Sequence, residues 1–127
     1  MEKKSKIWVI FINPTDQTIE RKQIDHDWDL MKSMIDTRII EALRILDYPT
    51  TYVLCDEEGR LKGEDYQKFT KMTLGYENVY EGNLMLVGAS RDEFDDCLLS
   101  LEQVKEAVEF MGDDYIDPPL DIQITSW

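Results

Sequence analysis

The stretch with the clearest potential for chemistry is IDHDWD, residues 24–29. It contains three alternating aspartates around the only histidine of the chain: Asp25, Asp27 and Asp29, with His26 between the first two. An EF-hand loop that began at Asp25 would need glycine at its sixth position and glutamate at its twelfth. The chain has Leu30 and Asp36 at these positions, so the spacing does not predict a calcium loop.

The start of a helix accounts for the same carboxylates. Apolar side chains recur at helical spacing over residues 27–35. Asp25 is placed to cap this helix by accepting backbone N–H bonds, and Asp27 and Asp29 would complement the helix dipole in the first turn. His26 has no second histidine or cysteine at ligand spacing. We therefore expect no metal site and no cofactor.

Motifs for covalent or phosphate chemistry are also missing from the sequence. It contains no G-x-S-x-G, no Walker loop and no G-x-G-x-x-G. Cys55 and Cys97 form no metal or redox motif, so we expect two buried thiols. Carboxylates are abundant, and an acid–base pair among them would leave no mark in the sequence. The prediction is a protein without enzyme activity.

The charge of the chain is large and unevenly distributed. The net charge is −13 over 127 residues. Residues 92–127 carry 11 acidic side chains and one basic side chain, Lys105, which gives a net of −10. Such a field repels nucleic acid and anionic lipid and favours basic partners. No apolar run approaches the ~20 residues of a membrane helix. We expect no direct contact with nucleic acid or membrane.

The acidic third contains the candidate partner-binding residues. Ser100 and Gln103 have capping-box spacing, and Gly112 is placed to end a helix that begins after Ser100. Four carboxylates would form one stripe on this helix: Glu102, Glu106, Glu109 and Asp113. Three more candidates precede the helix: Asp92, Asp95 and Asp96. The stripe could be a solvated polar face, or it could imitate the phosphate spacing of a nucleic acid.

The remaining patterns predict a single α+β domain over residues 1–127, with a mostly antiparallel sheet, two or three packed helices and an extended tail within 100–127. The expected strands are residues 6–14, 18–25, 50–59 and 84–87, and residues 38–46 fit a strand better than a helix. Residues 59–63 would continue a hairpin, and residues 64–72 could form a short helix. Pro118 and Pro119 confine the tail to an edge strand or an extended arm.

Three stretches in this order resemble a known family: FINPTDQTIE (11–20), TYVLCDEEGRLKG (51–63) and EGNLMLVGASRDEFDD (81–96). The family consists of short proteins of unknown function from bacteriophages, plasmids and conjugative elements. Its members share I-N-P-x-D-x-T, D-E-E-G-x-L-K-G and G-N-x-x-x-V-G motifs. The resemblance spans residues 7–111, departs at RIIEALRILDYPTT and excludes the acidic tail. It implies a mobile element acting in the bacterial cytoplasm, and it supplies no catalytic residue.

These observations predict a non-enzymatic binding protein of phage or mobile-element origin, located in the cytoplasm of a bacterial host. The expected partner is a basic host protein, such as a nucleic-acid-binding factor that an acidic surface would inhibit. One alternative is a small-molecule-binding protein with aromatic residues around a pocket: Trp8, Tyr52 and Tyr66. Another is a structural accessory protein that self-associates through an edge strand such as residues 119–126. The sequence leaves the oligomeric state open.

Overall fold

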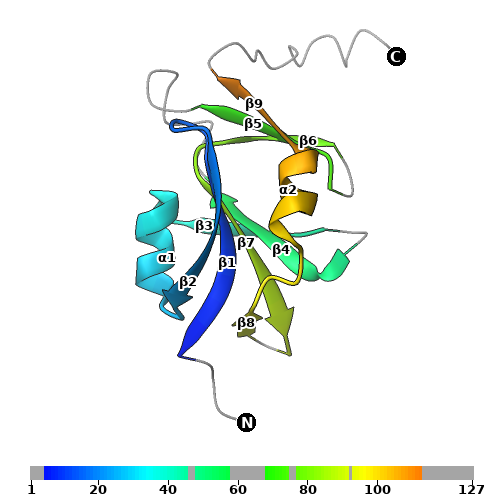
Figure 1. Cartoon of the computed structure of the whole chain (residues 1–127). Coiled ribbons are helices and arrows are strands. Elements are labelled where there is room, and N and C mark those ends of the chain that lie inside the picture. Colours follow the sequence, from blue (N-terminus) through cyan, green and yellow to red (C-terminus); the bar gives the residue numbers. More distant parts are fainter. Residues whose placement is uncertain (1–4, 46–47, 58–67, 75–76, 92, 113–127) are drawn as a thin grey trace, which may run out of the picture.

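A six-stranded antiparallel sheet forms the middle layer of the molecule (Figure 1). The computed structural model describes residues 5–45, 48–57, 68–74, 77–91 and 93–112. The strand order is β2-β1-β7-β4-β3, and β8 also pairs with β7. The six strands are β1 (Lys6–Asn13), β2 (Thr18–Asp25), β3 (Ile40–Ile45), β4 (Tyr48–Asp56), β7 (Leu84–Ser90) and β8 (Glu93–Asp95).

Different elements cover the two faces of this sheet. Helix α1 (Trp28–Ile35) packs on one face through Met31 and Ile35. Helix α2 (Leu101–Ala107) and a three-stranded antiparallel sheet cover the other face. The smaller sheet has the order β6-β5-β9 and contains β5 (Phe69–Met72), β6 (Asn78–Glu81) and β9 (Val108–Gly112). The predicted α+β class with a mostly antiparallel sheet is confirmed, with two helices in the described part of the chain.

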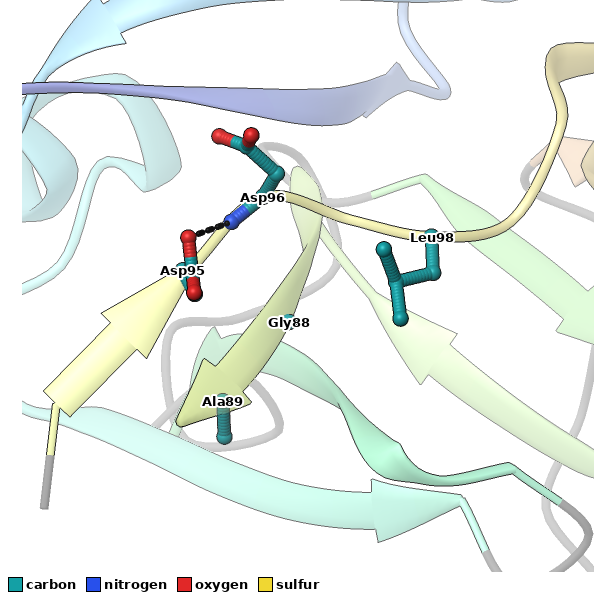
Figure 2. A pocket seen from close by; sticks show the side chains of 5 residues that line it. All are labelled: Gly88, Ala89, Asp95, Asp96 and Leu98. Carbon is teal, nitrogen blue, oxygen red and sulfur yellow. Dashed lines mark hydrogen bonds between the residues drawn. The ribbon is translucent and has the colours of Figure 1, made fainter. Parts of the chain in front are cut away.

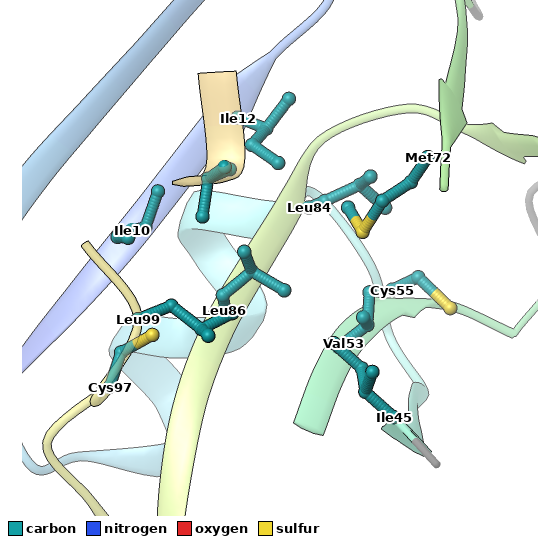
Figure 3. Close-up of a cluster of buried hydrophobic side chains, with 11 residues drawn as sticks. Ile10, Ile12, Ile45, Val53, Cys55, Met72, Leu84, Leu86, Cys97 and Leu99 are labelled. Atoms are coloured by element: carbon teal, nitrogen blue, oxygen red, sulfur yellow. The ribbon is translucent and has the colours of Figure 1, made fainter. Parts of the chain in front are cut away.

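Strand β7 lies at the centre of both cores. Its side chains alternate between the two faces. Leu84 and Leu86 join the core under α2, which Figure 3 shows, and Met85 and Val87 join the core under α1. All four side chains are fully buried. A strand that is buried on both faces reads as a continuous apolar run, as LMLV does here.

The first hairpin forms as the sequence predicts. The Asn13 side-chain oxygen accepts hydrogen bonds from the backbone N–H groups of Thr15 (3.0 Å) and Asp16 (3.1 Å), which closes the turn between β1 and β2. This Asx-type turn is the role expected of an asparagine before a proline. Within the described residues, the strands expected at 38–46, 50–59 and 84–87 are confirmed as β3, β4 and β7, with the bounds given above.

The cap of α1 was predicted at Asp25 and is instead Asp27. Asp27 has extended backbone angles, and its carboxylate accepts a hydrogen bond from the backbone N–H of Asp29. Asp25 does not cap the helix because it is the last residue of β2, where it pairs with Lys6, and the N–H of His26 donates to the Ser5 carbonyl. The cap therefore lies two residues later than the prediction, and Asp29 lies in the first turn as expected.

The predicted helix over residues 100–112 is wrong in its second half. Helix α2 ends at Ala107, and β9 follows directly from Val108. The backbone N–H of Thr73 donates to the Ala107 carbonyl at 2.9 Å, so the end of β5 meets the end of the helix. Pairing of β9 with β5 outweighs the helical periodicity of the apolar residues.

The short helix considered for residues 64–72 is also wrong where the structure describes this segment, because residues 69–72 form β5. Thr70 and Met72 are buried there in strand alternation. The predicted hairpin continuation at residues 59–63 and the predicted arm after Gly112 lie outside the described residues.

Candidate functional site

Helix α2 presents two carboxylates from a firmly fixed support. Ser100 and Gln103 form the predicted capping box: the Ser100 hydroxyl accepts from the Gln103 N–H at 3.1 Å, and the Ser100 N–H donates to the Gln103 side chain at 2.9 Å. Val104 is fully buried and anchors the helix to the core. Glu102 and Glu106, one turn apart on the exposed side, therefore project into solvent.

The sequence predicted that Glu109 would extend this row of carboxylates along the helix, but it does not. It lies on β9, where it is exposed and pairs in register with Lys71 of β5. The Lys71 ammonium group lies 3.4 Å from the Glu77 carboxylate, so a basic residue is already placed among these acidic side chains. The four-residue helical stripe thus reduces to Glu102 and Glu106, with Glu109 beyond the helix end.

Asp95 and Asp96 have structural contacts of their own. The Asp96 carboxylate accepts a hydrogen bond from the Trp8 N–H at 2.9 Å, and the Asp95 carboxylate accepts from the Asp96 N–H at 2.8 Å. The Cys97 N–H then donates to the Trp8 carbonyl at 2.8 Å. These bonds hold the segment after β8 beside Trp8 of β1.

A small hollow of about 110 Å³ lies beside this segment. Figure 2 shows its lining side chains, which are Gly88, Ala89, Asp95, Asp96 and Leu98. Leu98 is 75% exposed, although both of its neighbours are buried. The candidates Asp92 and Asp113 lie outside the described residues.

The aromatic pocket considered as an alternative does not form between Trp8 and Tyr52. Tyr52 packs against the core under α1. Trp8 alternates with Ile7 and Val9 of that same core, so its side chain points to the opposite face of the sheet. Tyr66 lies outside the described residues.

A different aromatic group does form, which no pattern in the sequence predicts. The rings of Trp28 and Phe94 stack with centroids 5.8 Å apart and planes inclined by 12°. Tyr52 meets Phe94 edge-on at 6.4 Å. Phe94 on β8 and Tyr52 on β4 lie close together because both strands pair with β7, and Trp28 reaches Phe94 from α1.

The two cysteines are buried, free thiols, as predicted. Burial raises the pKa of the Cys55 thiol from 9.0 to about 12, and the Glu41 carboxylate 3.8 Å from its sulfur adds to the rise. Burial also raises the pKa of Cys97. Both thiols stay protonated at neutral pH, which makes them poor nucleophiles.

We expect this shift to appear in the pH dependence of stability. Cys55 ionises near pH 9 in the unfolded chain and near pH 12 in the folded protein, so its contribution to stability is complete below pH 9 and is lost between pH 9 and 12. We expect the free energy of unfolding, measured with urea at pH 8 and pH 10.5, to fall with pH in both proteins. The fall should be less steep in Cys55→Ala than in the wild type, by up to about 1.4 kcal/mol per pH unit. Equal slopes in both proteins would contradict the assignment.

The described residues also bear on metal binding and on membrane insertion. Within them, no group of three or more His, Cys, Asp or Glu residues could hold a metal ion. No described helix has the length and apolar character to cross a membrane.

The fold and the site define the class of the molecule as a small α+β protein with an acidic exposed helix. The chain belongs to the family described as "Domain of unknown function (DUF3846)", whose model matches residues 6–112. Comparison with curated proteins gives no match, and comparison with solved structures gives none either. The expected membership of a family of unknown function is confirmed.

Proposed function

We propose that this chain is a non-enzymatic binding protein of phage or mobile-element origin that contacts a basic host protein. The contact surface is the α2 acidic surface, defined by Glu102 and Glu106. The observation that supports the proposal most directly is the fixing of α2 by its capping box and by Val104, which holds two exposed carboxylates one turn apart. They belong to a segment of the chain with a net charge of −10 over residues 92–127.

The chemistry of such a surface suits a protein that normally binds nucleic acid. Carboxylates on a rigid helix offer negative charge at fixed positions, as phosphates do along a nucleic-acid backbone. Complementary charge speeds association and selects the partner, and the resulting affinity falls with salt. Occupation of the nucleic-acid site of a host factor would inhibit that factor.

The test compares two double charge reversals that change the net charge equally. In Glu102→Lys/Glu106→Lys the α2 acidic surface becomes basic, while Glu20→Lys/Glu57→Lys alters exposed positions on β2 and after β4. Each protein is immobilised and exposed to a bacterial lysate at low and at high salt, and retained proteins are identified by mass spectrometry. Affinities for any retained protein are then measured with the purified pair.

We expect a basic, nucleic-acid-binding protein to be retained by the wild type and by the Glu20/Glu57 variant at low salt. The Glu102/Glu106 variant should bind that protein at least roughly tenfold more weakly, because two attractive charge contacts become repulsive. Binding that survives both high salt and the α2 reversals would reject the α2 acidic surface as the contact. Equal loss in both variants would show that only total charge matters.

A further inference from the structure

Trp28 is a large aromatic side chain held in place on one side and open on the other. It is the first residue of α1, and 44% of its surface is exposed. One face of its ring stacks on Phe94, which Tyr52 supports edge-on. Tertiary contacts therefore position the ring, although the side chain is not buried in the core.

Two other aromatic rings, those of Trp8 and Phe11, each have a basic side chain over one face. The Arg21 guanidinium lies 4.2 Å from the centre of the Trp8 ring, and the Lys22 ammonium lies 5.6 Å from the centre of the Phe11 ring. Both are cation–π contacts made across the β1–β2 hairpin. Trp28 has no such cation over it in the part of the chain that the structure describes.

The surroundings of Trp28 are acidic. Asp25, Asp27 and Asp29 all lie within three residues of it, and all three are exposed. Lys6 forms an ion pair with Asp25 at 2.8 Å, which leaves the local balance negative. A nucleobase could stack on an open tryptophan, but its phosphates would meet these carboxylates and a net charge of −13.

We propose that Trp28 is a docking site for an arginine side chain of a partner protein. A guanidinium group is planar and stacks on an aromatic face while its N–H groups reach carboxylates beside the ring. Lys32 lies one turn further along α1, and Arg44 lies opposite Tyr52 on β3, so the arginine would approach from the start of the helix. This site lies on the other face of the sheet from α2 and goes beyond the α2 acidic surface.

The experiment follows the tryptophan indole N–H signals of the full-length, ¹⁵N-labelled protein by NMR. The signal of Trp28 is assigned as the one missing in Trp28→Phe. The probes are acetyl-Gly-Arg-Gly-Arg-Gly-amide, the same peptide with lysine, and the same peptide with citrulline, the neutral analogue of arginine. We expect the arginine peptide to shift the Trp28 signal most and the citrulline peptide least. The Trp8 signal should move little, because Arg21 already covers that ring.

The decisive variant is Trp28→Leu, which keeps an apolar side chain and removes the aromatic face. Titrations of both proteins are followed through the backbone amide signals of α1, because the variant lacks the Trp28 indole. The variant should bind the arginine peptide about two- to fivefold more weakly and lose the preference for arginine over lysine. Equal binding by wild type and Trp28→Leu would overturn the proposal, as would equal shifts with arginine and citrulline. A single-stranded oligonucleotide that shifts the Trp28 signal would also overturn it, in favour of a nucleobase.

The Glu102→Lys/Glu106→Lys variant separates this inference from the proposed function. We expect it to give the same Trp28 shifts as the wild type, because α1 and α2 lie on opposite faces of the sheet. A failure at Trp28 would leave the α2 acidic surface standing, and a failure of the α2 reversals would leave the Trp28 site standing.

Discussion

Replacing Gly88 with alanine is expected to destabilise the protein by roughly 3 kcal/mol. A Cβ atom at this position would overlap the backbone carbonyl oxygen of Asp96 and lie 2.9 Å from the carbonyl carbon. Both atoms belong to the main chain of the segment that is hydrogen-bonded to Trp8 of β1, and main-chain atoms cannot move aside as the end of a flexible side chain could. Relief of the overlap requires that segment to move, which strains the bond from the Cys97 N–H to the Trp8 carbonyl.

The measurement is denaturant unfolding of Gly88→Ala, with hydrogen exchange of the Cys97 amide as a local readout. Gly82→Ala is the matched control, because it also adds one methyl group to a glycine. Gly82 has a φ of 81°, so its substitution should cost about 1 kcal/mol through backbone strain. A loss below about 1 kcal/mol for Gly88→Ala, with an unchanged Cys97 amide, would contradict the close approach.

The sequence predicts the first hairpin and β7 well because their signals are local. Asn13-Pro14 marks a turn, and the run from Leu84 to Val87 is apolar enough for a strand buried on both faces. Strand β8 could not be predicted from the sequence, and the reason is physical. It is three residues long, and its pairing depends on β7 leaving β1 after Leu86, a feature of the sheet as a whole.

The second half of the predicted C-terminal helix shows how a tertiary contact can outweigh periodicity. Val104 and Val108 fit a helical stripe, but Val108 and Phe110 also fit strand alternation, and both pack against the core under α2. The partner that decides between these readings is β5, 36 or more residues earlier in the chain. Local sequence carries no record of that pairing.

The candidate site was predictable to a similar degree. The capping box and the exposure of Glu102 and Glu106 follow from residues 100–106 alone, and the structure agrees with both. The displacement of Glu109 onto β9 follows from the β5 pairing and could not be foreseen. The stack of Trp28 on Phe94 joins residues 66 positions apart, so the sequence showed Trp28 only as part of a helix face.

Truncation of Leu86 to alanine is the second change with a large expected effect, about 2–5 kcal/mol of lost stability. Leu86 is fully buried at the centre of β7, where it pairs with Ile10 on one side and Val53 on the other. The missing methyl groups would leave a cavity between the sheet and α2, which backbone pairing on both edges of β7 prevents from collapsing.

Leu98→Ala supplies a control of the same residue type, because Leu98 is 75% exposed and lies 12 residues further along the chain. Its truncation deletes the same atoms as Leu86→Ala, but from an exposed position, and should change the free energy of unfolding by less than about 0.5 kcal/mol. Urea unfolding of both variants measures the difference. Similar losses in the two would mean that β7 is not the buried centre. The Leu98→Ala variant also tests binding separately from stability. A partner that loses affinity for this variant, while its free energy of unfolding is unchanged, must contact the surface at Leu98 directly.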